Sequence, residues 1–253
     1  MNLAVSNFAW TYDESKDIFE FFNKLGIKNI ELVLTKYKSW ELLDDFEILK
    51  YKNELDGFGV SPYAIQSLFY NVDCTIKDTK IIINHLEKLI QFSKLLDVKI
   101  LVFGSPSLRK KVDNFDYYLS KIFKDIDDLL YDKKITLLIE PNTKLYGGEY
   151  FNSVPEIVTF IKDNNLQNIK TMIDTHNILL EDMNPLIDIE ENFNYIHHIH
   201  ISEPNLSCIE DTNFHINFSR KIKEIKYDKM ITYEVNKCDF LKKSIELFCD
   251  IYK

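Results

Sequence analysis

The sequence has little that would suit a secreted or membrane-spanning protein. Its four cysteines show no CxxC spacing, and its first residues form an apolar stretch rather than a charged segment followed by a leader core. We therefore expect reduced thiols and a cytoplasmic location. The most apolar helical stretch, Ile81 to Leu96, is interrupted by polar and charged residues and falls short of the roughly 20 apolar residues that a bilayer span needs. We expect no association with a membrane.

Positive charge is also scarce. The chain has 31 lysines and arginines against 40 aspartates and glutamates, a net charge of -9, and only Arg109 and Arg220 are arginines. A phosphate backbone is bound by a basic stripe, so we do not expect nucleic acid as a partner. No GxGxxG or GxxxxGK[ST] motif follows an apolar run. This absence disfavours a nucleotide-binding, doubly wound sheet.

What the chain does contain is a regular alternation of short apolar runs with amphipathic stretches. At 253 residues and 45% hydrophobic, it can form one large core. The alternation predicts an α/β protein, a single-domain (β/α)8 TIM barrel over residues 1–253, with an open doubly wound sheet as the alternative. The predicted strands are Leu3 to Ser6, Ile27 to Val33, Gly59 to Gln66, Lys99 to Phe103, Ile135 to Glu140, Ile169 to Ile173, His197 to Ile201 and Met230 to Val235.

Four residues end or nearly end the last four of these runs: Glu140, Asp174, His200 and Glu234. In a barrel of this kind the carboxyl ends of the strands form the active-site face. A single carboxylate there often only caps the next helix, but four such side chains in consecutive units favour a shared ion. Three carboxylates and one imidazole suit one divalent cation, Mn²⁺, Mg²⁺, Co²⁺ or Zn²⁺.

These four residues resemble the metal ligands of the xylose isomerase-like TIM barrels. Further motifs carry the same resemblance: SNFAW, IQS, FGSPSLR, EPN, YGGEYF and HIHISEPNL. That superfamily includes sugar and sugar-phosphate isomerases and epimerases as well as the family 2 apurinic endonucleases. The resemblance implies that Glu140 and Glu234 both bind the metal and act as an acid/base pair on opposite sides of a substrate carbon. It implies that Asp174 and His200 are metal ligands only.

The implied reaction belongs to carbohydrate metabolism, with manganese among the expected metals. One carboxylate removes a carbon-bound proton, the metal stabilises the enediolate, and the other carboxylate returns the proton. The expected partner is a small sugar or sugar phosphate. Which sugar, which metal and how many subunits stay open, and a homo-oligomer is compatible with the sequence.

The chain departs from the epimerase pattern near the expected substrate contacts. The family's histidine three positions after the aspartate is replaced by Asn177, with His176 one residue earlier, and SEPNL stands where an arginine is expected. We therefore expect His176 and Asn177 to contact substrate in a different way. Glu203 and His215 are candidates to replace the missing contact, and a solvated loop carboxylate and a helix-start histidine are the alternative interpretations.

Five further residues are candidate substrate contacts. Trp10 could form a flat wall against a sugar or pack under a loop. Glu31 and Gln66, polar residues in apolar runs, could bind hydroxyls or each other. Arg109 could bind a phosphate or carboxylate, or belong to an exposed basic cluster. Glu149 ends a YGGE segment that could form a lid and bind a hydroxyl.

Three alternative functions follow from the same residues. A polyol dehydratase would use the same first proton abstraction. An apurinic endonuclease-like phosphodiesterase would need three zinc ions; His215 matches one extra ligand, but Asn213 and Asn177 replace an aspartate and a histidine. A barrel that has lost catalysis is the third alternative, and it is disfavoured because all four presumptive metal ligands are present.

Overall fold

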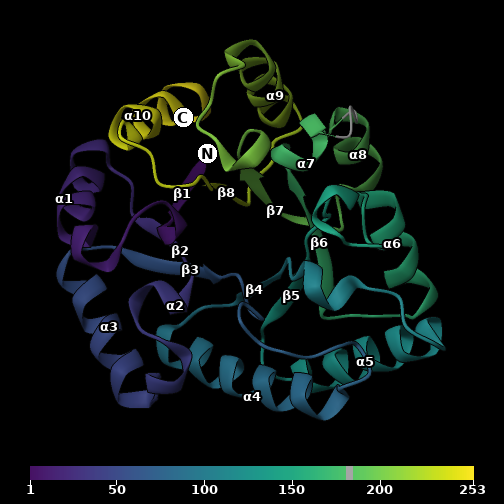
Figure 1. The fold of residues 1–253 in the computed structure, drawn as a ribbon. Coiled ribbons are helices and arrows are strands. Elements are labelled where there is room, and N and C mark those ends of the chain that lie inside the picture. The colour runs from purple at the N-terminus through teal and green to yellow at the C-terminus, as the bar shows by residue number, and fades with distance from the viewer. Residues whose placement is uncertain (181–184) are drawn as a thin grey trace.

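Eight parallel strands close into a barrel in the computed structural model, which describes residues 1–180 and 185–253 (Figure 1). The strands pair in chain order, and β8 pairs with β1 to complete the ring. The predicted (β/α)8 barrel is confirmed. The strands are β1 (Asn2–Ser6), β2 (Asn29–Leu32), β3 (Ser61–Ile65), β4 (Ile100–Phe103), β5 (Thr136–Ile139), β6 (Ile169–Asp174), β7 (Ile196–Ile201) and β8 (Met230–Tyr233).

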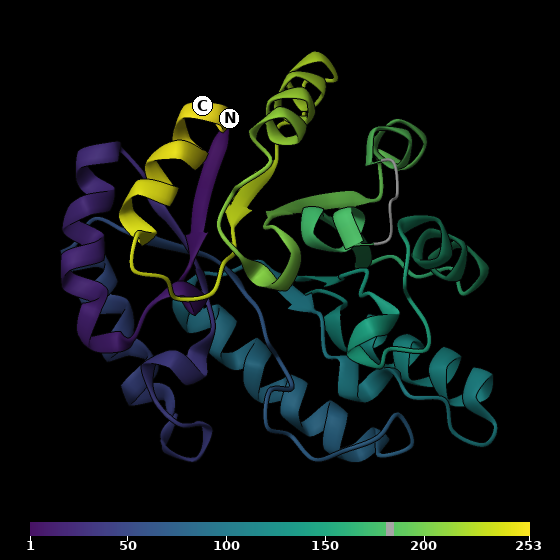
Figure 2. The same ribbon diagram turned by 45° about the horizontal axis from the view of Figure 1, so that its top comes forward.

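Helices surround the sheet on its outer side, and the two ends of the chain lie close together beside β1 (Figures 1 and 2). No helix in the described part of the chain is long and apolar enough to cross a membrane. The α-helices are α1 (Ser15–Leu25), α2 (Leu34–Tyr37), α3 (Asp45–Gly57), α4 (Thr79–Leu96), α5 (Phe115–Leu130), α6 (Val154–Asp163), α7 (Thr175–Leu180), α8 (Pro185–Asn192), α9 (Thr212–Glu224) and α10 (Leu241–Tyr252).

The first unit shows why the sequence forms these elements. In α1, Ile18, Phe19 and Phe22 recur at helical spacing and are buried. Burial of each such side chain contributes about 1.5 to 3 kcal/mol. The helix ends where Gly26 adopts a left-handed conformation (φ 69°) and its N–H donates to the carbonyl of Phe22. The chain then turns directly into β2.

The barrel interior is apolar in the middle of the strands and polar at their carboxyl ends, which form the mouth of the barrel. Ala64, Val102, Leu138 and Met172 form a small cluster separate from the main core. Along a strand, every second side chain faces the same side. The residue two positions after each of Ala64, Leu138 and Met172 is therefore also directed into the barrel, closer to its mouth. Those residues are polar: Gln66, Glu140 and Asp174.

His197 lies three residues before His200 on β7, so its side chain faces the opposite side of the strand. Its pKa makes the stability of the fold depend on pH. Partial burial, followed by the charges of Lys229 and Lys170, lowers the pKa of His197 to about 4. The unfolded chain takes up this proton near pH 6.5, so stability from neutral His197 is present above that pH and is lost as the pH falls toward 4. We expect His197→Asn to flatten the fall in melting temperature over this interval. Equal pH slopes for variant and wild type in a thermal-denaturation series would contradict this.

Candidate metal centre

The four residues at the ends of β5 to β8 meet at the mouth of the barrel. In the register of the sheet, Asp174 on β6 lies beside His200 on β7, and His200 lies beside Thr232 on β8. Glu140 directly follows β5, and Glu234 directly follows β8. Glu140, Asp174 and Glu234 line one cavity of about 410 Å³, which we call the inner cavity. A cavity of this size is suited to a small-molecule ligand.

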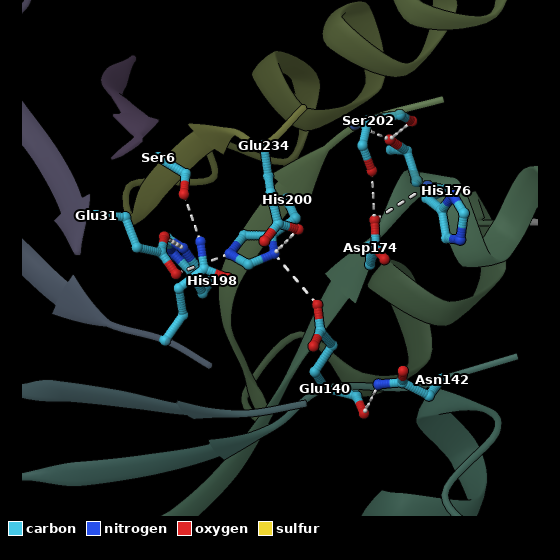
Figure 3. A network of polar contacts seen from close by, with 12 residues as sticks. Ser6, Glu31, Glu140, Asn142, Asp174, His176, His198, His200, Ser202 and Glu234 are labelled. Atoms are coloured by element: carbon cyan, nitrogen blue, oxygen red, sulfur yellow. Dashed lines mark hydrogen bonds and ion pairs between the residues drawn. The ribbon is translucent and has the colours of Figure 1, made fainter. Parts of the chain in front are cut away.

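Three of the four side chains form a tight group. His200 Nδ1 lies 3.2 Å from Glu140 Oε1 and 3.1 Å from Glu234 Oε2. One ligand atom from each of these residues fits within 4.8 Å of the others. Asp174 stands beside this group: its Oδ1 accepts hydrogen bonds from Ser202 Oγ (2.8 Å) and from the backbone N–H of His176 (3.0 Å) (Figure 3).

The buried carboxylate of Glu31 orients His200 from the side opposite Glu140 and Glu234. His200 Nε2 lies 2.9 Å from Glu31 Oε1, and His198 Nε2 lies 2.7 Å from Glu31 Oε2; all three side chains are fully buried. Figure 3 shows His200 between Glu31 on one side and Glu140 and Glu234 on the other. A proton on Nε2, donated to Glu31, leaves the Nδ1 lone pair directed at the two glutamates. This is the arrangement by which a second carboxylate fixes a metal-binding histidine.

The electrostatics of the group favour a bound cation. Burial, and then the carboxylates of Glu140 and Glu234, raise the pKa of Asp174 well above its usual range. Burial acts to lower the pKa of His200, but Glu31 and Glu234 outweigh it and raise that pKa. The raised pKa means that, without a cation, His200 carries a proton on Nδ1 between Glu140 and Glu234. The crowded carboxylates attract positive charge, and with the imidazole they form a donor set that fits a divalent cation, which would replace that proton.

Gly104, at the end of β4, leaves the space that Glu140 occupies. A Cβ atom at this position would lie 2.1 Å from Glu140 Oε2, so any side chain would displace the carboxylate. We expect Gly104→Ala to fold but to bind metal more weakly; were Glu140 to act on a substrate, a displacement of about 1 Å would also lower the rate by about 100-fold. Metal titration and thermal denaturation measure the two properties separately.

The control for this variant is Gly57→Ala at the end of α3, where an added Cβ meets nothing within 4 Å. Gly57→Ala should match the wild type in metal affinity. Unchanged metal binding by Gly104→Ala would contradict the role given to Gly104.

Two further predicted residues lie on the inner cavity. Gln66 follows β3, lines the cavity and donates a hydrogen bond to Ser6 Oγ. His176 also lines it, and its Nδ1 pairs with the carbonyl of Glu203 (2.9 Å). The ring of His176 is thereby held between the loop after β7 and the cavity.

Glu203 and His215 form a separate chain of contacts. Glu203 Oε1 accepts hydrogen bonds from the backbone N–H groups of Glu210 and Asp211, which precede α9. His215 Nε2 lies 3.2 Å from the same oxygen, and His215 Nδ1 lies 2.7 Å from the hydroxyl of Tyr252. Burial lowers the pKa of His215 despite the Glu203 carboxylate. The structure thus places both side chains where they fix the start of α9 to α10.

Arg109 is fully buried beneath the loop that follows β4. Its guanidinium donates to the carbonyls of Phe103 (2.7 Å) and Phe151 (3.1 Å), and burial lowers its pKa to about 10. The exposed Glu149 joins the same loops, because its carboxylate accepts the N–H of Lys111 and its own N–H donates to the carbonyl of Arg109. These contacts hold the loops after β4 and β5 together.

Trp10 and Asn177 also lie away from the inner cavity. Trp10 is 2% exposed, packs edge-on against Phe19 and Phe22, and donates from Nε1 to Ser15 Oγ. Asn177 is buried at the start of α7 and donates to the carbonyl of Asn152. Neither residue is brought together with the four presumptive ligands.

Several lining residues were not among the predicted contacts. Phe8, Tyr70 and Leu206 come from the loops after β1, β3 and β7 and line the inner cavity with Asn142. Phe8, Asn142 and Leu206 had a signal in the sequence, since they belong to the SNFAW, EPN and HIHISEPNL motifs. Tyr70 had none, and all four stand in loops without periodicity, so only closure of the barrel brings them together.

Comparison with known proteins finds the same fold. Solved structures with the same fold include a 3-keto-D-glucoside 4-epimerase from E. coli (14% identity, TM-score 0.74, covering 99% of both chains). They also include a family 2 AP endonuclease from Brucella melitensis (16%, 0.76, 99% of both). A third is a D-psicose 3-epimerase from Clostridium cellulolyticum H10 with D-tagatose (18%, 0.75, 99% of this chain and 91% of that one).

These identities are low and support the fold alone. A search of curated proteins finds no match. The family model described as xylose isomerase-like TIM barrel matches residues 19–249, which is most of the chain. The protein therefore belongs to the xylose isomerase-like TIM barrel family.

Proposed function

We propose that the protein is a divalent-metal-dependent isomerase or epimerase that acts on a small sugar or a sugar derivative. One observation carries the proposal: Glu140 and Glu234 approach the same histidine nitrogen from two different strands, at the floor of a cavity large enough for a sugar. Two carboxylates so placed can address one substrate carbon from two directions.

Glu140, Asp174, His200 and Glu234 would hold the cation. When bound, a divalent cation would stabilise the negative charge that develops on a substrate carbonyl oxygen as a neighbouring carbon loses its proton. Glu140 and Glu234 supply the proton transfers: one carboxylate accepts the proton and the other, on the far side, returns one. Ser202 and the N–H of His176 fix Asp174 so that it does not compete for this role.

The comparisons support a sugar as substrate. Two of the similar structures are sugar epimerases, one acting on a 3-keto-D-glucoside and one on D-psicose. Another is a probable 3-DHS dehydratase from Bacillus anthracis (14% identity, TM-score 0.72), a reaction that can begin with the same proton abstraction. We favour the isomerase or epimerase because a second glutamate at this position would return the proton.

The test is exchange of substrate hydrogen with heavy water. Purified protein should contain about one divalent ion per chain by elemental analysis, and a panel of ketoses and ketose derivatives should gain deuterium at one carbon. Removal of the ion by a chelator should abolish exchange and lower the melting temperature, because three crowded carboxylates lose their counterion. Mn²⁺, Mg²⁺, Co²⁺ or Zn²⁺, each added back alone, identifies the active metal.

Exchange that persists in the metal-free protein would contradict the proposal. Retention of the ion with no exchange into any compound of the panel would favour the dehydratase or a binding role instead.

A further inference from the structure

A second cavity borders the first. It has a volume of about 410 Å³, equal to that of the inner cavity, and we call it the outer cavity. The two cavities share four lining residues: Phe8, Ser67, Tyr70 and Asn71. The two cavities therefore adjoin at Phe8 and Tyr70, and a ligand held at Glu140 and Glu234 that is long enough to extend beyond these two rings would enter the outer cavity.

Aromatic rings lie at the boundary of the two cavities and in the outer cavity. Tyr70 is 60% exposed although it is large and partly apolar, and Phe8 faces both cavities. Trp40 lines the outer cavity but not the inner one, and Lys36 and Glu41 also line the outer cavity. Flat rings beside a few polar groups are the usual surroundings of a sugar ring, whose C–H faces pack on aromatic carbon while its hydroxyls bind polar side chains.

The charge of the inner cavity argues against a phosphorylated substrate. Among the described residues, no lysine or arginine lines it, and its carboxylates are those of Glu140, Asp174 and Glu234. Arg109 is fully buried and donates to backbone carbonyls, so its guanidinium is not available to a phosphate. In the outer cavity the charge of Lys36 is matched by Glu41, and Lys36 Nζ lies 4.9 Å from the ring centre of Phe8.

We propose that the outer cavity is a subsite for a second, neutral sugar ring. The substrate is then a neutral glycoside or disaccharide: its reacting ring occupies the inner cavity, an assignment that rests on the proposed function, and its glycosyl group packs among Phe8, Trp40 and Tyr70. The specificity of the enzyme is set by the loops after β1, β2 and β3 together.

Tryptophan fluorescence tests the subsite without reference to catalysis. The chain has two tryptophans: Trp40 lines the outer cavity, whereas Trp10 is buried under α1. Three probes share one ketose and differ at a single oxygen: D-fructose, D-fructose 6-phosphate and isomaltulose, which carries a glucosyl group there. We expect isomaltulose to change the emission saturably, with a dissociation constant at least about tenfold below that of D-fructose, and the phosphate to bind no more tightly than D-fructose.

A variant that fills the outer cavity tests whether the preference for isomaltulose arises there. Ser39 is exposed, lines the outer cavity and makes no capping hydrogen bond at the short helix that follows it. Ser39→Phe should fill the subsite and reduce the affinity for isomaltulose to that for D-fructose, with the affinity for D-fructose unchanged. The matched control is Ser61→Phe at the exposed first residue of β3, at the opposite end of the barrel, which should keep the preference. Trp40→Phe should remove the fluorescence change.

Equal affinities for isomaltulose and D-fructose, or an unaltered preference in Ser39→Phe, would overturn the subsite, as would the absence of saturable binding by any probe. Tightest binding by D-fructose 6-phosphate, abolished in Lys36→Met, would show an anion site instead and also overturn it. The proposed function can fail independently of the subsite. If the protein binds isomaltulose more tightly than D-fructose but no probe exchanges deuterium, the isomerase proposal is contradicted and the subsite proposal stands. If D-fructose and isomaltulose exchange deuterium equally, the subsite proposal is contradicted and the isomerase proposal stands.

Discussion

Glu234→Gln should lower the rate of deuterium exchange by about 10²- to 10⁴-fold, the usual contribution of a general acid or base. Glutamine keeps the shape of the side chain but cannot accept a proton at neutral pH. The same loss is expected for Glu140→Gln, because the two carboxylates approach His200 Nδ1 at nearly the same distance, 3.2 and 3.1 Å. The measurement is the rate of exchange at saturating metal, with metal content determined in parallel.

Two results separate proton transfer from metal binding in these variants. If exchange falls while the ion is retained at saturating metal, the carboxylate acts on the proton. The control is Glu87→Gln on the exposed face of α4, which should exchange at the rate of the wild type. A Glu234→Gln protein that keeps a tenth or more of the exchange rate would remove Glu234 from the acid/base pair.

Glu31→Gln should reduce metal affinity by about 10- to 100-fold, the effect of removing an outer partner of a histidine ligand. Burial acts to raise the pKa of Glu31, but the charges of His200 and His198 and their hydrogen bonds hold it well below its usual range. The carboxylate is therefore ionised and accepts from both rings. An amide accepts from only one ring and turns an N–H₂ group toward the other, so one histidine must reverse its tautomer or lose its partner.

The same variant should also lower the free energy of unfolding, by about 3 to 5 kcal/mol if it breaks the buried pair completely. Denaturant unfolding and metal titration measure the two effects. Glu20→Gln on the exposed face of α1 is the control, since no buried partner depends on it. Unchanged metal affinity in Glu31→Gln would show that Glu31 does not orient His200.

The sequence predicted the barrel because each βα unit is encoded locally. Apolar runs of strand length and amphipathic stretches of helix length recur along the whole chain, and Gly26 marks where α1 ends. The same local logic pointed to Glu140, Asp174, His200 and Glu234, because the end of a strand can be found from the end of an apolar run. Because every second side chain of a strand faces the same side, His198 shares the face of His200, and the structure shows both of them at Glu31.

The contacts of side chains in the loops could not be predicted from hydrophobic periodicity. Arg109 and Trp10 stand in loops after strands. For Trp10 the sequence allowed a ligand contact or packing under a loop, and for Arg109 a ligand contact or an exposed basic cluster; the structure buries both. Cys208 and Cys238 show no motif at a separation of 30 residues, yet their sulfur atoms lie 2.9 Å apart. Their proximity follows from the adjacency of β7 and β8, not from spacing.

The sequence by itself therefore determined the elements, their order and the strand ends at which charged side chains gather, because these depend on hydrophobic periodicity along a few consecutive residues. Only the tertiary structure decided that Glu31 lies beneath His200 and that Phe8 and Tyr70 separate two cavities. Such contacts join residues that are distant in the chain, and they exist only once the barrel closes and its loops pack against one another.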